Sequence, residues 1–455
     1  MKTIISCLRY FIDIIIFAFP KVVRNQYSES YWSYFEMLKR LRSNIQILFK
    51  KIYTQYNDIT ELDCKKTRLF HQHNRSSRIS SPCLVTNKSV ILEELNEKVP
   101  DINVYLLEHV AIVGGTDLLI NQKTSGFYHF ELSEMGQQHD MKAHDIISDE
   151  MPVDNSNNTT ISDILNASKK RYIYHLSKKN LKDDTIYLCL LKEHSVNYYH
   201  WITEVIPRLL VSLKVLSKQE NFNLNNYTLV VDDNLPMQLM ELLLLLTSPD
   251  MKIIAIKRAE LARVKKLVYC SPLWLSLDNS KGLPNPRKEF FIDRYALNLV
   301  RSSIKAKNPL DVSTKPFRRI YLRRLNNKLR PLKNLDRLED MLRKQEFDFI
   351  DVGNLTFLEQ IKVFSEAKII VGISGAAFTN ILFMNKGTHA ISLYPSSPST
   401  NYYVFQPLAD ASGVCLLHFL TQQASADSSV HAKASVDVKR LERQINELGI
   451  NNGKD

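Results

Sequence analysis

The sequence is poor in the features that mark disulfide-rich and zinc-binding proteins. Its 455 residues contain only 6 cysteines, and no two of them form a C-x-x-C pair. The cysteines are Cys7, Cys64, Cys83, Cys189, Cys270 and Cys415. This scatter predicts neither a zinc site nor a disulfide framework, and it is typical of reduced thiols in a cytosolic protein.

Long apolar runs are also missing. The most apolar stretch near the start, residues 10–23 (YFIDIIIFAFPKVV), contains Asp13 and falls short of the roughly 20 apolar residues that a spanning helix needs. No small-x-small cleavage site follows, since residues 17–20 read FAFP. We therefore predict neither a transmembrane helix nor a removed signal peptide.

Two nucleotide-related signatures are absent as well. No G-x-G-x-x-G turn is followed by an acidic residue placed to bind a ribose, which argues against a dehydrogenase. No RNP, helix-turn-helix or zinc signature occurs, and the basic residues are spread over the chain, which argues against a nucleic-acid-binding protein. The net charge of +12, from 60 basic and 48 acidic residues, still indicates a polyanionic neighbour such as a nucleotide or a membrane surface.

A basic amphipathic helix is predicted at residues 38–52. Its apolar residues recur at alternate steps of three and four, while lysines and arginines occupy other positions. Such a helix either binds an anionic lipid surface or packs on the protein's own body, and composition does not separate the two. We expect a cytoplasmic protein, peripheral on the inner face of the membrane if this helix binds lipid, with no nucleic-acid partner.

The length and the 44% hydrophobic content allow more than one core. An Asn-rich stretch at residues 149–170 reads as a linker, and a Pro-rich bridge lies at residues 282–286. We predict an N-terminal helical extension (1–60), an N-terminal domain (61–285) and a C-terminal domain (286–455).

Apolar runs alternate with helical stretches in both predicted domains, which indicates βαβ units and parallel sheets. The predicted strands are residues 186–191, 229–231, 253–256, 267–269, 320–322, 347–352, 369–373, 390–394 and 414–419. The predicted helices are residues 201–216 and 236–246, with further helices that start near residues 334, 356, 376 and 402. The predicted fold class is α/β, with two Rossmann-like, doubly wound domains that face a cleft.

The stretch VGISGAAFTN, residues 371–380, overlaps the end of a predicted strand and is rich in small residues. Small residues after a strand let the backbone approach a phosphate at the N-terminus of the next helix. Gly372, Ser374, Gly375 and Ala376 fit that role. The simpler alternative is that small residues only let the strand and the helix pack closely.

Three arginines follow the predicted strand at residues 320–322. Arg323 and Arg324 come directly after it, and Arg330 lies in the turn that follows. Guanidinium groups match diphosphate oxygens in geometry and in charge, so these side chains are candidates to neutralise a leaving nucleotide without a metal. For Arg323, a solvated basic face is the equally good alternative.

The segment NYYHWITEVIPRLL, residues 197–210, places His200, Glu204 and Arg208 on one stripe of a helix. A neutral imidazole, with a pKa of about 6.5, is able to take a proton from a hydroxyl group, although a histidine beside a tryptophan is equally often a packed core residue. The simplest interpretation of Glu204 is an ion pair with Arg208. Its alternative is a carboxylate base whose pKa is raised in a dry cleft.

Three ordered motifs together resemble glycosyltransferase family 61, which includes many bacterial capsular polysaccharide biosynthesis enzymes. They are NYYHWITEVIPRL, then IYLRR followed by RPLKN, then FLEQIKVFSEAKIIVGISGAAFTNILFM, within residues 186–419. The resemblance implies a GT-B-like fold and inverting transfer of a sugar from a nucleotide diphosphate sugar to a glycan acceptor, with no cofactor. It does not identify the sugar.

The resemblance also implies roles for individual residues. His200 is the expected general base, with Glu204 as the second candidate. The expected donor-binding residues are Arg324, Arg330, Ser374, Gly375, Ala376 and Asn380, and the expected acceptor-side residues are Asn197, Tyr199, Trp201 and Arg208. No metal site is expected, because the acidic pairs Asp183–Asp184 and Asp232–Asp233 are interpreted as solvated or capping residues.

Two positions depart from the family pattern. Ser374 stands where the family has histidine, and Leu335 follows Asn334 where the family has glutamate. A serine donates a hydrogen bond but carries no charge, so the alternative function is a catalytically silent, nucleotide-binding scaffold of a polysaccharide assembly complex. Asn334 is predicted to cap its helix, and Thr356 with Glu359 has the form of a capping box.

Overall fold

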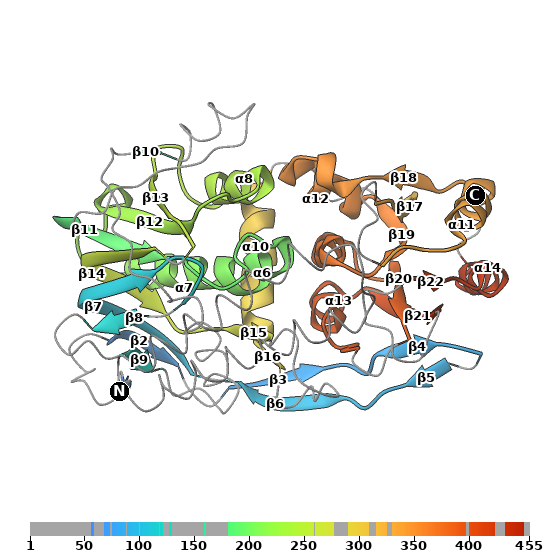
Figure 1. The fold of residues 1–455 in the computed structure, drawn as a ribbon, viewed down its shortest axis with the longest axis horizontal. Helices are drawn as coiled ribbons and strands as arrows, with labels where there is room; N and C mark the ends of the chain where they lie inside the picture. Colours follow the sequence, from blue (N-terminus) through green and yellow to red (C-terminus); the bar gives the residue numbers. More distant parts are fainter. Residues whose placement is uncertain are drawn as a thin grey trace, which may run out of the picture.

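The computed structural model describes most of the chain after residue 67. The described residues are 56–58, 68–121, 127–129, 159–160, 181–276, 290–308, 315–324, 330–396, 400–423 and 433–449, except 73, 74, 88, 100, 118 and 259. The apolar stretch at residues 10–23, the predicted helix at residues 38–52 and the bridge at residues 282–286 lie outside them. Figure 1 shows two halves side by side, each with a sheet and with helices at their junction. The α/β class is confirmed.

The sheet of the N-terminal half has a parallel centre. Its strands there follow the order β14-β11-β12-β13, and β7 runs antiparallel beside β14. The bounds are β7 (Ile102–Val113), β11 (Leu181–Cys189), β12 (Tyr227–Asp232), β13 (Lys252–Ile256) and β14 (Leu261–Cys270). The outer strands are β1 (Tyr56–Asp58), β2 (Arg68–Gln72), β8 (Leu119–Asn121), β9 (Phe127–His129) and β10 (Thr159–Thr160).

One long helical segment covers this sheet, as predicted for residues 201–216. It consists of α6 (Tyr198–His200), a π-helical turn η1 (Trp201–Val205) and α7 (Ile206–Leu216). The π turn has a local cause, because Pro207 has no N–H to donate to the preceding turn and its ring crowds that turn. The Ile206 N–H instead bonds to the Trp201 carbonyl.

The other helices of this half lie at the junction. They are α8 (Met237–Leu246), the short 3₁₀ turn η2 (Leu224–Asn226) and α10 (Arg294–Lys307). Helix α10 was not predicted from the sequence. It contacts α7 and α8 on one side and helices of the C-terminal half on the other (Figure 1).

The sheet of the C-terminal half follows the order β18-β17-β19-β20-β21-β4-β5. All neighbours from β18 to β4 are parallel, and β5 and β22 are antiparallel additions. The strands are β4 (Cys83–Val85), β5 (Ser89–Ile91), β17 (Arg318–Leu322), β18 (Asp348–Ile350), β19 (Ala367–Ile373), β20 (His389–Pro395), β21 (Cys415–Gln423) and β22 (Ala434–Ser435). The five strands predicted here are confirmed.

Helices alternate with these strands. They are α11 (Leu335–Lys344), η3 (Val352–Asn354), α12 (Phe357–Ser365), η4 (Ala376–Phe383), α13 (Gln406–Ser412) and α14 (Val438–Glu447). The predicted start near residue 356 is confirmed, and the helix after Gly375 is a 3₁₀ helix. In the sheet, β17 lies between β18 and β19. The chain therefore passes from β17 to β18 on one side and then returns to β19 on the other side, so the direction of the connections reverses at β17. Ligands of open α/β sheets bind beyond the carboxyl ends of strands at such a switch point.

The chain crosses between the halves more than once. The ribbon β3 (Arg75–Ile79) with β6 (Leu95–Val99) flanks β4 and β5, and β4 pairs with β21. Residues 83–91 therefore complete the C-terminal sheet, although the predicted boundaries assign them to the N-terminal domain. The hairpin of β15 (Trp274–Ser276) and β16 (Phe290–Ile292) leads the chain back to α10. A single boundary near residue 285 does not describe this path.

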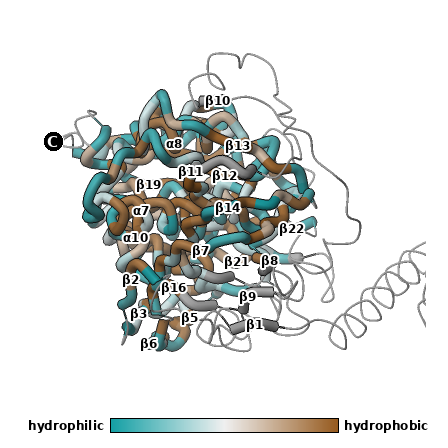
Figure 2. The backbone as a smooth tube through the Cα atoms, turned by 90° about the vertical axis from the view of Figure 1, so that its left-hand side faces the viewer, coloured by the Kyte–Doolittle hydropathy of each residue, from teal (hydrophilic) through white to brown (hydrophobic). Residues whose placement is uncertain are grey.

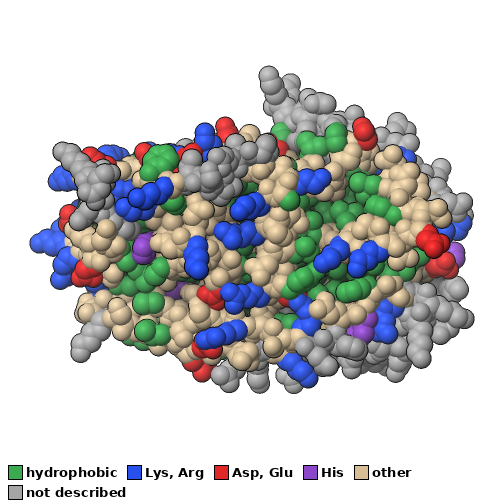
Figure 3. All heavy atoms as spheres, turned by 180° about the vertical axis from the view of Figure 1, so that it is seen from behind, with side chains coloured by type: hydrophobic (Ala, Val, Ile, Leu, Met, Phe, Trp, Pro, Cys, Tyr) green, Lys and Arg blue, Asp and Glu red, His purple; other side chains and the backbone are tan. Residues whose placement is uncertain are grey.

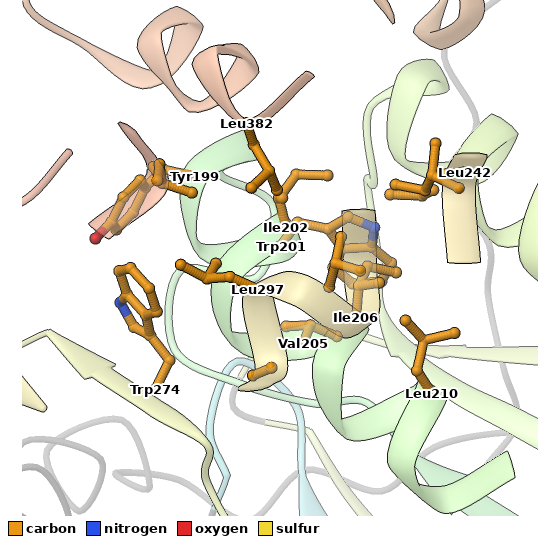
Figure 4. Close-up of a cluster of buried hydrophobic side chains, with 14 of the residues drawn as sticks. Tyr199, Trp201, Ile202, Val205, Ile206, Leu210, Leu242, Trp274, Leu297 and Leu382 are labelled. Carbon is orange, nitrogen blue, oxygen red and sulfur yellow. The ribbon is translucent and has the colours of Figure 1, made fainter. Parts of the chain in front are cut away.

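Apolar side chains fill much of the junction between the halves. One hydrophobic cluster contains Trp201, Leu297 and Leu382 together with core residues of both sheets. Figure 4 shows these three side chains converging from the η1 segment, α10 and η4. Figure 2 shows the hydrophobic segments concentrated toward the middle of the molecule. The halves thus share a core instead of facing each other across an open cleft along their whole length.

One face of the molecule carries its charge in a dispersed form (Figure 3). On the face drawn in Figure 3, lysine and arginine side chains are scattered among neutral and acidic ones. Within the described part of the chain, no helix has the length and apolarity needed to cross a membrane. The four described cysteines, Cys83, Cys189, Cys270 and Cys415, are all free thiols.

Candidate active site

A pocket of about 320 Å³ lies at the switch point of the C-terminal sheet and is bordered on its other side by the N-terminal half. The C-terminal half contributes Leu322, Arg323, Arg324, Asp351, Val352, Gly353, Gln360, Ile373, Ala376, Ala377 and Asn380. The N-terminal half contributes Tyr198, Pro236, Gln238 and Leu239. Three of the six predicted donor-binding residues, Arg324, Ala376 and Asn380, therefore line one pocket.

Hydrogen bonds across this pocket fix the two halves to each other. The Tyr198 hydroxyl donates to the Asn380 Oδ1 at 2.5 Å, and the Asn380 Nδ2 donates to the Gln360 Oε1 at 2.9 Å. The Gln238 Nε2 donates to the carbonyl oxygens of Gly353 and Leu355 at 3.0 and 3.1 Å. Because its amide is committed at both ends, Asn380 holds the pocket wall in place.

Two guanidinium groups converge beside the pocket. Arg324, after the end of β17, and Arg330 both donate to the main-chain carbonyl of Ser374, after the end of β19. Burial lowers the pKa of both groups, and for Arg324 the charge of Arg330 lowers it further. Among the described residues, no carboxylate forms an ion pair with Arg324. A half-buried pair of cations of this kind is suited to an anion with several oxygens.

Gly375 makes this convergence possible. A Cβ atom at that position would lie 2.9 Å from the Arg324 Cζ and closer still to one of its nitrogens. Gly372 has a different role, because its Cβ would meet the Leu322 side chain at 2.8 Å, where β17 and β19 pack closely. The two glycines thus fulfil both alternatives that the sequence raised: close packing at Gly372 and access for a functional group at Gly375.

Ser374 does not offer its side chain to the pocket. The residue is buried, and its hydroxyl is hydrogen-bonded to the Tyr394 hydroxyl. Ser374 is not among the residues that line the pocket, so the contact of its side chain with the donor stays a prediction. Its carbonyl oxygen, by contrast, anchors both arginines.

The remaining polar residues of the arginine motif have structural partners. Arg323 forms two hydrogen bonds to Glu339 on α11, at 2.9 and 3.1 Å. Asn334 occupies the N-cap position of α11, but its side chain pairs with the main chain of Val436 instead of capping, so that prediction is wrong. The capping box of Thr356 and Glu359 is confirmed.

His200 belongs to a buried polar cluster in the N-terminal half. Its Nδ1 lies 2.7 Å from the Glu204 Oε1, and the Lys192 Nζ lies 3.0 Å from the Glu204 Oε2. Asp117, in the turn between β7 and β8, lies 3.5 Å from the same Nζ. The side chains of Lys192 and Glu204 are each only 2% exposed. Burial alone would raise the pKa of Glu204, but Lys192 and His200 outweigh it and hold the pKa below its ordinary value.

Asp232, at the end of β12, is a further buried carboxylate that contacts this cluster through the main chain of Lys192. It accepts hydrogen bonds from the main-chain N–H groups of Gly115 and Lys192 and from the Ser195 hydroxyl. Desolvation raises the pKa of Asp232 to about 6, although these three donors counteract the shift. Asp232 is thus a buried hydrogen-bond acceptor, and the side chains of Asp183 and Asp184 lie outside the described ones.

The expected ion pair between Glu204 and Arg208 is absent from the described contacts. Glu204 pairs with His200 and Lys192, while Arg208 donates to the carbonyl oxygens of Leu191 and Cys270 and stacks on the Tyr269 ring. The π turn explains the difference, because it shifts the residues after it around the helix axis relative to a regular helix. Arg208 is therefore a buried structural cation and offers no exposed guanidinium group to an acceptor.

Three other predicted acceptor-side residues also have structural roles. Asn197 caps α6 by accepting from the Tyr199 N–H at 2.9 Å. The Tyr199 hydroxyl donates to the Val404 carbonyl across the junction at 3.2 Å. Trp201 has no exposed surface and packs in the shared core (Figure 4), so its ring is not accessible to an acceptor in this structure. Tyr198, which we did not single out, is the aromatic residue of this motif that lines the pocket.

The structure does not place His200 in the lining of the pocket, although Tyr198 is two residues away. Sequence reasoning also missed Lys192, Asp117 and Ser195, because they belong to no motif and come together only through the fold. Among the described side chains, no group of three or more histidine, cysteine, aspartate or glutamate residues is arranged to hold a metal ion.

The chain matches a known family over this region. Residues 198–391 match the family model described as Glycosyltransferase 61. The matched segment begins at Tyr198 and ends within β20, so it contains every residue that lines the pocket together with Arg330 and His200. No curated protein matches the chain. The match confirms the resemblance that the three sequence motifs indicated.

Proposed function

We propose that this chain is a glycosyltransferase that uses a nucleotide diphosphate sugar as its donor, because residues 198–391 match the model of glycosyltransferase family 61. The proposed reaction transfers the sugar, with inversion, to a hydroxyl group of a glycan acceptor in the synthesis of a capsular or other surface polysaccharide. The observation that carries the proposal is the meeting of Arg324 and Arg330 on the Ser374 carbonyl beside the switch-point pocket.

In the proposed binding mode, the diphosphate lies at the tips of β17 and β19. Arg324 and Arg330 then exchange part of their contact with the Ser374 carbonyl for phosphate oxygens. The first amides of η4 add uncharged donors, and Gly375 leaves room for the approach. Charge develops on the diphosphate as the glycosidic bond breaks, and half-buried guanidinium groups stabilise that charge more than water would. No metal is needed in this scheme to neutralise the leaving group.

The proposed chemical step is a single displacement. The acceptor oxygen attacks the anomeric carbon, and its proton passes to His200. The bond between the anomeric carbon and the diphosphate oxygen breaks, and the nucleotide diphosphate leaves with the bonding electrons. Both Glu204 oxygens are already engaged, and its pKa is lowered, so we assign Glu204 to orienting His200 and withdraw it as the second base.

The donor site is tested by calorimetry with uridine and guanosine diphosphates and their sugars. An Arg324→Ala variant is expected to lose about tenfold to hundredfold in affinity, which corresponds to one charge-assisted hydrogen bond. Arg318→Ala is the matched control, because Arg318 lies at the opposite end of the same strand and pairs with Asp348 and Glu366. Equal affinity in the parent and the Arg324→Ala variant would show that the diphosphate binds elsewhere.

The base is tested separately by His200→Ala. We expect the variant to bind donor as the parent does and to lose at least about a hundredfold in transfer rate. A parental rate would remove His200 from the chemical step. A thermal-shift screen of the same ligands with and without chelator then examines the donor class and the need for a metal together.

One observation favours the alternative function, a catalytically silent nucleotide-binding scaffold. The buried Ser374 carries no charge, whereas the histidine that the family has at this position is titratable. A silent scaffold would bind nucleotide but show neither transfer nor donor hydrolysis.

We also propose a cytoplasmic location, peripheral on the inner membrane face through residues 1–60. Flotation with vesicles that contain anionic or only neutral lipid tests this, since binding only to the anionic vesicles is expected.

A further inference from the structure

The cluster around His200 contains more charge than the proposed mechanism uses. Its members come from six segments of the fold: the turn after β7, the loop after β11, α6, η1, α7 and the end of β12. They are Asp117, Lys192, His200, Glu204, Arg208 and Asp232, and all are buried. Glu193, His194 and Asp233 lie at its margin, where solvent screens their charge. The His194 ring centroid is 5.5 Å from that of His200.

These buried charges do not balance while His200 is neutral. Lys192 and Arg208 are cations, whereas Asp117, Glu204 and Asp232 are carboxylates, so the cluster has one excess negative charge. An uncompensated charge is costly where water is excluded. A proton on His200 removes the imbalance, and Glu204, 2.7 Å from its Nδ1, is placed to accept the hydrogen bond from the imidazolium.

Lys192 links these groups. Its ammonium group lies between Glu204, at 3.0 Å, and Asp117, at 3.5 Å, and its main-chain N–H donates to Asp232 at 3.2 Å. Burial alone would lower the pKa of Lys192, but Glu204 and Asp117 raise it above its ordinary value. The ammonium therefore stays charged and fixes the Glu204 oxygen that His200 does not use.

We propose that Lys192 and Asp117 are positioning residues for His200: Asp117 makes the imidazole a stronger proton acceptor, and Lys192, whose own charge acts in the opposite direction, holds Glu204 in place beside it. Lys192 fixes Glu204, which fixes the imidazole ring, and Asp117 supplies the carboxylate in excess. The inference rests on the proposed function, in which His200 receives the proton of the acceptor hydroxyl. It adds two residues that lie outside the segment matched by the family model.

The test is a histidine titration by NMR of the full chain labelled with ¹³C at the imidazole Cε1. Of the 12 histidine signals, that of His200 is identified by its loss in a His200→Gln variant. Removal of one carboxylate charge, by Asp117→Asn or by Glu204→Gln, is expected to lower its titration midpoint by about one pH unit or more. The matched control is Asp250→Asn, an exposed acid of the same half that leaves the midpoint unchanged.

The double variant Lys192→Met with Asp117→Asn removes one charge of each sign and is expected to return the midpoint close to the parental value. Lys192→Met alone is expected to raise the midpoint, because it removes a buried positive charge, and a purely structural role would not produce these opposite shifts. The proposal is overturned if folded Asp117→Asn and Glu204→Gln variants titrate like the parent. If the Lys192→Met variants do not fold, these two isosteric variants still decide the outcome. A His200→Ala variant with parental transfer rate would refute the base assignment alone and leave the charge inference standing.

Discussion

Gly375→Ala is the substitution that most directly probes the arginine site. The new Cβ would lie 2.9 Å from the Arg324 Cζ and still closer to a guanidinium nitrogen, so the guanidinium group must move. The backbone does not oppose the change, because Gly375 has a φ of 164°, which is extended geometry open to any residue. The displaced group is the end of a flexible side chain, and it leaves the Ser374 carbonyl.

The Gly375→Ala substitution should weaken nucleotide binding much more than it changes the stability of the fold. Loss of one charge-assisted hydrogen bond to phosphate costs about 1.5–3 kcal/mol, which is roughly tenfold to more than a hundredfold in Kd. The free energy of unfolding should change by less than about 1 kcal/mol, since alanine at a compatible φ also restricts the unfolded chain. Gly372→Ala is the contrast, because its Cβ meets core atoms of Leu322 at 2.8 Å and overpacking costs about 1–3 kcal/mol of stability.

The assay is calorimetry with a nucleoside diphosphate on four proteins: the parent, Gly375→Ala, Arg324→Ala and the double variant. If the alanine acts by displacing Arg324, it should cost little affinity in the Arg324→Ala background. Full additivity of the two losses would refute the reasoning, and so would parental affinity in the Gly375→Ala variant.

Three further substitutions probe buried groups. Burial lowers the pKa of His418 to about 3. The stability that the neutral His418 contributes is therefore complete above the unfolded pKa of about 6.5 and is lost as the pH falls from there towards 3. Between pH 7 and pH 4, the free energy of unfolding of the His418→Phe variant should fall by on the order of 3 kcal/mol less than that of the parent, measured by urea unfolding. Glu241→Ala removes the carboxylate that accepts from the Phe357 N–H at the start of α12 and should cost about 1 kcal/mol, seen as a lower Tm. Tyr198→Phe leaves the buried Asn380 Oδ1 without its donor and should cost about 1–3 kcal/mol in denaturant titrations.

The parallel strands could be predicted because their sequences are nearly continuous apolar runs. Strands such as β12 and β19 are buried on both faces, and a run of that kind stands out against polar helix surfaces. Helix α12 was equally clear, because its capping box is a local signal. Helix α10 was missed, although its buried residues Leu297, Val300 and Ile304 recur at helical spacing and Asp293 caps it. The pairing of β4 with β21 joins residues too distant in sequence to predict.

The candidate site divides in the same way. The motifs identified Arg324, Gly375 and His200, whose residue types and positions after a strand or on a helix already suggest their chemistry. They did not reveal that the Ser374 hydroxyl turns towards Tyr394, because rotamer and burial depend on packing. Nor did they reveal Lys192, whose partner Asp117 lies 75 positions earlier, after β7, which β14 separates from β11 in the sheet.

The pairing of β4 with β21 has a consequence for biosynthesis. Cys83 pairs in register with Leu417, so the first part of the C-terminal sheet leaves the ribosome more than 300 residues before its neighbour. At roughly 5–20 residues per second this delay is about 17–67 s. During translation β4 is able to pair with β5, but its other edge lacks β21, and an N-terminal fragment that ends before residue 415 should expose that edge to chaperones or to other nascent chains.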